Sequence, residues 1–428
     1  MTDKPDSGRP HTDGKAKKAL ATCSGAHVVH DGVSDILYVL LPALAQHFGL
    51  SLAQVGLIRS AHRAAMTLFQ IPVAVWAERI GEKNLLVLGT ALSGAAWIAL
   101  GMAPGFIPLL LILFVAGLGT AVQHPLAAAI VSQAYPEQGR RIAIGQYNFW
   151  GDFGKLAFAG GASIWLGFQL PWQVPGYFFG ALTLAAALVI LVMLNNLDLG
   201  GHPDRPKRAQ ESERQPAESR PVRSKGWGIK HGVGFSALCT IKLFDSLTRT
   251  GFLTFAAFLL IAKGIPEGWA VQAPPIIFIG GMIGKLAFGY LAERFGVFRT
   301  VIAAALTTGS GIFLILLLPG WSAMLILAFT GITLNGTSSV LYGSVGDYID
   351  ANKQGRAFGL FYTLGSAAGI IAPLGFGLIG DWAGIEVTIA IVGALPFFVI
   401  PLCFVLRSSA RELEHTAGLA VEKPAAVS

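Results

Sequence analysis

Ionisable side chains lie inside otherwise apolar stretches of the sequence, and their spacing is that of one helix face. His27, Asp31 and Asp35 follow one another at four-residue intervals in the first apolar stretch, which places them on one side of an α-helix. A charge at the centre of a bilayer costs at least about 2.5–3.5 kcal/mol unless it faces protein or water. Carboxylates and imidazoles also take up and release protons. The pattern therefore predicts a proton-binding site inside a membrane protein.

The second apolar stretch supplies cations at the matching spacing, Arg59 and Arg63. Two antiparallel helices joined by a short loop bring together residues whose numbers have a constant sum. Asp31 with Arg63 and Asp35 with Arg59 give the same sum, so we predict a ladder of two ion pairs near mid-membrane. The same counting predicts a pair between Asp245 and Lys285 in the second half of the chain.

The candidate site residues are polar or aromatic side chains at membrane depth. The candidates for proton coupling are Asp31, Asp35, Asp152 and His124. The candidates for a central cavity or a substrate contact are His27, His30, Arg59, Arg63, Tyr147, Lys155, Lys242, Asp245, Arg249, Asn335, Tyr342 and Tyr362. The alternative is that these ion pairs are permanent and only hold helices together, and the residues leave both interpretations open.

The composition is that of a membrane protein. Apolar residues make up 53% of the chain and charged residues 13%, against about 25% charged in soluble domains. Apolar runs of about 20 residues, the length that crosses a bilayer, repeat along the chain. No metal-ligand or disulfide spacing joins the three cysteines, and no pairing of a nucleophile with a base is evident, so we expect no metal, no cofactor and no enzymatic activity.

Lys and Arg gather in alternate loops, which predicts a cytoplasmic side and places both termini there. The net charge of +7 is thus a feature of topology and requires no nucleic-acid partner. The predicted segments are a cytoplasmic tail (1–20), a six-helix bundle (21–197), a cytoplasmic linker (198–230), a second bundle (231–407) and a tail (408–428). The predicted spans are 21–45, 52–77, 84–103, 107–133, 141–168, 174–197, 231–262, 269–292, 299–318, 321–347, 355–380 and 385–407.

Short motifs recur at an offset of about half the chain. Ala77-Glu78-Arg79-Ile80-Gly81 returns as Ala292-Glu293-Arg294-Phe295-Gly296, and Gln138-Gly139-Arg140 returns as Gln354-Gly355-Arg356. A repeat of this kind indicates two structurally related halves, the plan of many secondary transporters. Gly81 and Gly296 stand where a helix end favours a residue with positive φ.

These features resemble the major facilitator superfamily over Ala21 to Arg407. Its loop signature, Gly-x-x-x-Asp-Arg-x-Gly followed by basic residues, is matched by Gly289 to Gly296 with Glu293 in place of Asp. The first half matches it at Glu78, Arg79 and Gly81. The resemblance implies an all-α membrane protein of twelve transmembrane helices in two pseudo-symmetric six-helix bundles, working as a monomer. It also implies a gating role for Glu78, Arg79, Gly81, Gly289, Glu293, Arg294 and Gly296.

Within the superfamily, the first half is similar to the fosmidomycin-resistance type of efflux protein. The supporting residues are His27-x-x-His30-Asp31, His124-Pro125 and Gly151-Asp152-Phe153-Gly154. The chain departs from the Gly-Pro pair that antiporters of the superfamily carry in the fifth helix, since Phe158-Ala159 stands there.

We therefore expect a proton-coupled secondary transporter of a small molecule in the inner membrane, working by alternating access. Drug or metabolite efflux by proton antiport is the first hypothesis. Proton-coupled uptake (symport) of a small organic anion is the alternative, because cations outnumber acids at membrane depth. A remote alternative is a membrane receptor or scaffold that transports nothing. The lipid bilayer, protons and a small-molecule substrate are the expected partners.

Overall fold

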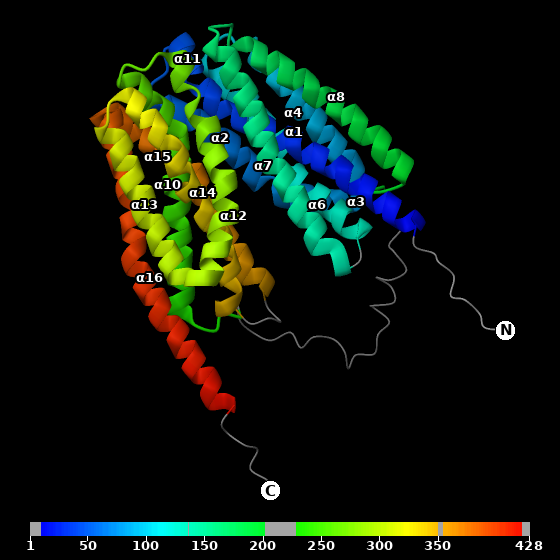
Figure 1. Cartoon of the computed structure of the whole chain (residues 1–428). Helices are drawn as coiled ribbons and strands as arrows, with labels where there is room; N and C mark the ends of the chain where they lie inside the picture. Colours follow the sequence, from blue (N-terminus) through cyan, green and yellow to red (C-terminus); the bar gives the residue numbers. More distant parts are fainter. Residues whose placement is uncertain (1–9, 136, 202–227, 350–353, 422–428) are drawn as a thin grey trace, which may run out of the picture. The chain divides into compact units, whose positions relative to one another are not determined.

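The computed structural model describes residues 10–135, 137–201, 228–349 and 354–421, and these are helical almost throughout. No named strand occurs in these ranges, only an isolated bridge between Ile229 and Ile349. The contacts divide the chain into two compact units (Figure 1). Unit 1 comprises Met1–Leu50 and Leu57–Gln215, and unit 2 comprises Ser51–Gly56 and Pro216–Ser428.

The described residues up to Leu197 form eight helices. They are α1 (Pro10–Phe48), α2 (Leu52–Leu68), α3 (Gln70–Ile80), α4 (Glu82–Leu100), α5 (Phe106–Thr120), α6 (Gln123–Ala134), α7 (Glu137–Gly167) and α8 (Gln173–Leu197). The start of α2 is a capping box: the Gln54 amide donates to Ser51 Oγ (3.3 Å), and the Ser51 amide donates to Gln54 Oε1 (2.9 Å). This arrangement satisfies amide groups that a helix start leaves unpaired.

The second half, from Gly232 onward, contains α10 (Gly232–Ala262), α11 (Glu267–Ala270), α12 (Ala273–Phe295), α13 (Val297–Leu317), α14 (Gly320–Ser344), the 3-10 turn η2 (Val345–Tyr348), α15 (Gln354–Ala383) and α16 (Ile385–Val421). Two predicted ends are wrong. The first helix begins at Pro10 rather than residue 21, and the last continues to Val421 rather than ending at 407, because polar residues extend a helix beyond the bilayer without penalty.

Ten of the described helical stretches are long and apolar enough to cross a membrane. The two remaining predicted spans correspond to α2 with α3, which is interrupted at Phe69, and to α7, whose apolar character is diluted by Arg140, Arg141, Asp152 and Lys155. All twelve predicted spans are therefore present as helix. The all-α membrane fold predicted from the sequence is confirmed.

Prolines explain why several spans are split. Pro72, Pro125 and Pro274 lie within the first turns of α3, α6 and α12, directly after the breaks that precede those helices. Proline lacks an N–H and clashes with the preceding turn, so it is tolerated at a helix start and disrupts a helix interior. Pro42 and Pro373 lie inside α1 and α15 without ending them.

The repeated loop motif has the same backbone in both units. Gly81 separates α3 from α4 with φ 90° and ψ 142°, and Gly296 separates α12 from α13 with φ 84° and ψ 152°. This region of positive φ is accessible to glycine and costly for other residues. The sequence repeat is therefore also a structural repeat.

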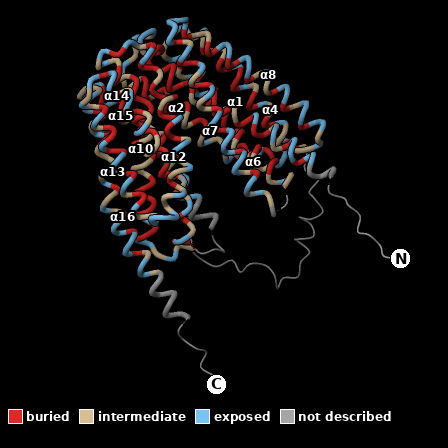
Figure 2. The backbone as a smooth tube through the Cα atoms, in the orientation of Figure 1, coloured by how far each residue is buried: buried red, intermediate tan, exposed pale blue. Residues whose placement is uncertain are grey.

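Each unit has its own core of buried hydrophobic residues, and buried residues are drawn in red in Figure 2. Glycines let the helices approach closely, as membrane helices require. In unit 1, a Cβ atom at Gly94 would lie 2.8 Å from the Gly180 carbonyl oxygen, and the reverse also holds. The three cysteines are free and buried, as expected of small packing residues.

Candidate functional site

The candidate site of unit 1 lies where α7 crosses α1. A Cβ at Gly154 would be 2.2 Å from the Val28 carbonyl oxygen, and one at Gly151 would be 2.4 Å from His27 Nε2. Only glycine permits this close approach of the two helices. The crossing carries Lys155 to the face of α1 that presents Asp31.

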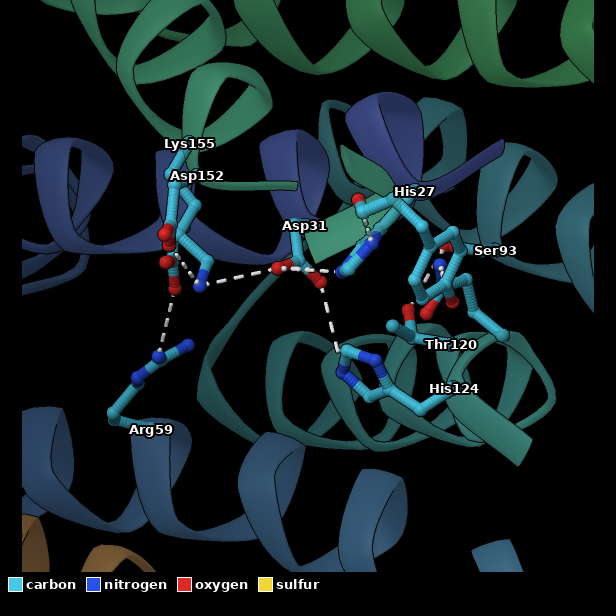
Figure 3. A network of polar contacts seen from close by, with 11 residues as sticks. His27, Asp31, Arg59, Ser93, Thr120, His124, Asp152 and Lys155 are labelled. Atoms are coloured by element: carbon cyan, nitrogen blue, oxygen red, sulfur yellow. Dashed lines mark hydrogen bonds and ion pairs between the residues drawn. The ribbon is translucent and has the colours of Figure 1, made fainter. Parts of the chain in front are cut away.

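Asp31 is the centre of a network of basic side chains (Figure 3). Its Oδ2 lies 3.2 Å from His27 Nε2 and 3.1 Å from Lys155 Nζ, and its Oδ1 lies 3.7 Å from His124 Nε2. Lys155 is shared, since its Nζ is also 3.3 Å from Asp152 Oδ1. Three of the four residues proposed for proton coupling, and two of those proposed for the cavity, therefore meet in one cluster.

The hydrogen bonds of His27 determine where protons lie in this cluster. Its Nδ1 is 2.9 Å from the Tyr147 carbonyl oxygen, which can only accept, so Nδ1 carries a hydrogen. The opposite nitrogen, Nε2, faces the Asp31 carboxylate. A neutral ring with its hydrogen on Nδ1 presents the Nε2 lone pair to Asp31 Oδ2, 3.2 Å away. The pair is therefore a place that can take up one proton, shared between nitrogen and oxygen.

One predicted ion pair between α1 and α2 is confirmed. Arg59 Nη2 lies 3.1 Å from Asp35 Oδ1, and Arg59 Nη1 donates to the Ser34 carbonyl at 3.0 Å. The guanidinium also lies over the ring of Tyr38, 3.8 Å from its centroid. These contacts occupy both terminal nitrogens of a buried arginine, 3% exposed, whose Nε has no hydrogen-bond partner among the described residues. The pair connects α1 to α2.

The other predicted pair, Asp31 with Arg63, is wrong. Arg63 is not within ion-pair distance of Asp31, whose partners among the described residues come from α1, α6 and α7. Counting along a hairpin assumes that only its two helices compete for a side chain. Here the glycine-lined crossing of α7 supplies a nearer cation.

His30 does not join the cluster. Its Nε2 donates to Thr90 Oγ1 at 2.8 Å, and that hydroxyl donates onward to the Leu86 carbonyl at 2.6 Å. The ring is completely buried. This arrangement is a hydrogen-bonded packing contact between α1 and α4.

The cluster has donor atoms that a transition metal could use, although no metal was expected from the sequence. The ligand atoms of His27, Asp31 and His124 all lie within 4.8 Å of one another. The ammonium of Lys155, 3.1 Å from the same carboxylate, opposes a further cation there. The cluster suits a proton better than a metal ion.

Unit 2 contains a smaller charged pair on α10. Lys242 Nζ lies 3.2 Å from Asp245 Oδ2, and Thr337 on α14 donates a short hydrogen bond to Asp245 Oδ1. Lys242 is 1% exposed and lies over the Tyr342 ring. The predicted pair of Asp245 with Lys285 is therefore wrong, because residues of α10 and α14 occupy the carboxylate.

Tyr342 connects further cavity candidates of unit 2 to this pair, since its ring lies beneath Lys242 and beside Tyr362. Tyr342 and Tyr362 have ring centroids 5.4 Å apart, and Tyr362 is 58% exposed. Asn335 donates to the Gly331 carbonyl of its own helix and packs against Gly281, which is a packing role. Arg249 is half-buried on α10, two turns beyond Lys242.

The acids of the repeated loop motif are exposed. Glu78 and Glu293, together with Arg79, form no hydrogen bond or ion pair with another described residue, and Arg294 contacts only Tyr290 and Phe295. Gly289 lies within α12, one turn before Glu293. Side chains of the start of α15 lie outside the described residues. The docking of these acids on a neighbouring helix stays a prediction.

Several contributors were not anticipated from the sequence. Tyr38, Thr90 and Thr337 orient Arg59, His30 and Asp245, and Gln123 donates to the Tyr147 hydroxyl at 2.8 Å. Neither ring nitrogen of the buried His62 has a hydrogen-bond partner among the described residues. Of these residues, only Gln123 could have been identified from the sequence, because it directly precedes the candidate His124. Thr and Tyr are too common in membrane helices to be singled out.

Membrane-length helices whose buried charges are paired with other side chains are those of a multi-pass membrane protein. A family model described as "Major Facilitator Superfamily" matches residues 23–284 and 268–426. The chain belongs to this superfamily.

Its relatives are transporters. The chain is 22% identical to the probable galactarate/D-glucarate transporter of Escherichia coli K12, with 87% of this chain and 88% of that protein covered. It is 24% identical to the D-galactonate transporter of E. coli O6:H1, with 83% and 89% covered. A bacterial homologue of the human lysosomal transporter Spinster, solved inward-facing and unoccupied, shares the fold with a TM-score of 0.68 at 16% identity, with 95% of this chain and 97% of that chain covered.

Proposed function

We propose that the chain couples the movement of a small organic anion to that of a proton, as a symporter of the inner membrane with both termini in the cytoplasm. The protein works as a monomer by alternating access of one central site. The observation that carries this proposal is that the imidazole of His27 and the ammonium of Lys155 share one oxygen, Asp31 Oδ2.

Sharing one oxygen couples the proton to the anion. While Asp31 is ionised, it occupies Lys155 at 3.1 Å. Once the carboxylate is protonated, its attraction for the ammonium is lost, and Lys155 becomes available to a carboxylate of the substrate. Proton and anion then favour each other's binding, which is the condition for symport.

The charges of the unit 1 network also favour binding of the anion together with the proton. The network contains the cations Arg59 and Lys155, the histidines His27 and His124, and the acids Asp31, Asp35 and Asp152. With neutral histidines and ionised acids it carries one net negative charge, and one bound proton makes it neutral, which removes a repulsion against a substrate anion. The two relatives are named as transporters of sugar acids, which are carboxylates at neutral pH.

The direction of transport is tested in proteoliposomes containing the purified chain and radiolabelled D-glucarate or D-galactonate. An acidic exterior should drive accumulation, and a protonophore should abolish it. If inward proton movement instead drives exit of the label, the protein is an antiporter, the direction first expected from the sequence and from the resemblance to fosmidomycin-resistance proteins. If the proteoliposomes accumulate the same amount of labelled substrate with and without a pH gradient, transport is not coupled to protons.

A further inference from the structure

A cavity of about 260 Å³ lies in unit 2, remote in the chain from the charged clusters. It is formed where α12 ends, α13 begins and α16 passes. Its lining includes two arginines, three aromatic rings and a thiol, namely Arg299, Arg407, Phe295, Phe298, Phe404 and Cys403. Gly296 of the repeated loop motif also lines the cavity, but neither this motif nor the proposed transport mechanism assigns a ligand to it.

The two arginines are available to a ligand. Among the described residues, neither Arg299 nor Arg407 forms an ion pair or hydrogen bond with another side chain, and both are exposed. Two positive charges placed at one cavity repel each other unless an anion lies between them. A guanidinium binds phosphate oxygens through two parallel hydrogen bonds, so a phosphate group matches this pair.

The cavity lies at the depth of lipid headgroups. From Ile385 to Arg407, α16 rises about 33 Å, and from Leu317 back to Arg299, α13 rises about 27 Å, at 1.5 Å per residue. The hydrocarbon core of a bilayer is about 30 Å thick. Both arginines therefore lie near one edge of the hydrocarbon, the edge that the distribution of Lys and Arg assigns to the cytoplasm.

Apolar side chains border the arginines. Phe295 is 51% exposed and Phe404 is 58% exposed, whereas Cys403 is buried at 1%. A ligand that satisfies both the guanidinium groups and the exposed rings must have an anionic head and an apolar body. An inorganic or soluble phosphate offers only the head.

We infer that this cavity is a binding site for the headgroup of an anionic phospholipid. The phosphodiester is held between Arg299 and Arg407, and the acyl chains run along Phe295 and Phe404. Basic pockets between membrane helices on the cytoplasmic side are suited to such headgroups.

The test uses the purified full chain, delipidated in detergent, with native mass spectrometry and thermal unfolding as readouts. Phosphatidylglycerol should give bound adducts and raise Tm, while phosphatidylcholine and inorganic phosphate should do neither. In the double variant Arg299→Gln/Arg407→Gln, phosphatidylglycerol affinity should fall about tenfold or more, the effect of losing a charge-assisted hydrogen bond.

The matched control is Lys18→Gln/Arg411→Gln, which removes the same charge from exposed positions on α1 and α16 that do not line the cavity. It should bind as the unmodified chain does. The milder variant Arg407→Lys keeps the charge but loses the planar guanidinium with its two parallel hydrogen bonds, and should bind phosphatidylglycerol with intermediate affinity. Equal adducts in both double variants would overturn the inference, as would stabilisation by inorganic phosphate equal to that by phosphatidylglycerol.

Discussion

At the scale of single residues, the position of a proton follows from which atoms can only accept hydrogen bonds. The Tyr147 carbonyl fixes the hydrogen of His27 on Nδ1, so the lone pair of Nε2 faces Asp31, and the two groups together can take up a proton. His30, three residues away, instead completes a chain of hydrogen bonds through Thr90. Neighbouring histidines on α1 thus have different roles because their partners differ.

Replacement of Asp31 by Asn should abolish accumulation driven by a pH gradient, because Asn cannot carry the proton and no longer competes for Lys155. Exchange of labelled for unlabelled anion without a gradient should persist. The control is Asp198→Asn, at the C-terminal end of α8, where φ is 49° and Asn is well tolerated. Unchanged gradient-driven accumulation in Asp31→Asn would remove Asp31 from the coupling step.

Lys155 should set the affinity for the anion. Lys155→Gln removes the charge that faces Asp31 and is expected to raise KM for the sugar acid about tenfold or more, the consequence of losing one charge-assisted hydrogen bond. Lys155→Arg, which keeps the charge, should recover part of the affinity. Measurement of initial uptake rates over a range of substrate concentrations separates KM from maximal rate. An unaltered KM in Lys155→Gln would contradict the substrate contact.

The contrast with His30 is also measurable. Thr90→Val leaves the buried Nε2–H of His30 without an acceptor, which costs about 1–3 kcal/mol of stability. Thermal unfolding in detergent should show a lower Tm, while the dependence of uptake on external pH should not shift. A shifted pH profile at unchanged Tm would place His30 in the coupling machinery after all.

At the scale of helices, close crossings place the functional side chains. α7 reaches α1 through Gly151 and Gly154, and this contact brings Lys155 to Asp31. On the same helix, nothing lies within 4 Å of a Cβ built on Gly160. Glycines on one helix therefore differ in what they tolerate.

Gly154→Ala should separate α1 from α7, since the new methyl would lie 2.2 Å from the Val28 carbonyl oxygen. We expect transport to be lost or strongly reduced and Tm to fall, because backbone cannot move aside as a flexible side chain can. Gly160→Ala is the matched control and should be close to neutral in both measurements. If Gly154→Ala and Gly160→Ala have the same transport activity and the same Tm, then α1 and α7 do not approach each other as closely as described.

At the scale of the whole molecule, the chain is two helical units with matching loop geometry at Gly81 and Gly296. The net charge of +7 is distributed mainly over loops on one predicted side of the membrane. This distribution predicts orientation, since loops rich in Lys and Arg stay in the cytoplasm.

Cysteine labelling tests the orientation. The native cysteines are all buried, so they should react slowly with a membrane-impermeant maleimide. The cysteine of Asn84→Cys should be labelled only after the membrane is permeabilised, because it faces the cytoplasm. The cysteine of Pro104→Cys should be labelled in intact cells. Both positions are exposed. Labelling of the two cysteines from the same side would refute the predicted topology.

The sequence by itself determined the class of protein, the twelve helical spans, the internal repeat and the face of α1 that carries His27, Asp31 and Asp35. These properties depend on hydropathy and spacing within contiguous residues, which a helix converts directly into geometry. The ion pair of Asp35 with Arg59 could also be predicted from the sequence, because a short loop joins their helices.

Only the tertiary structure decided the partners of Asp31, the packing role of His30 and the contact of Asp245 with Thr337. Lys155 and His124 come from helices distant in the sequence, and their arrival depends on which helices glycines allow to cross. Spacing along one helix or one hairpin contains no information about a third helix. The meeting of Asp31 with Lys155 and His124 is therefore a consequence of packing, whereas Asp31 itself was already a candidate for proton binding in the sequence.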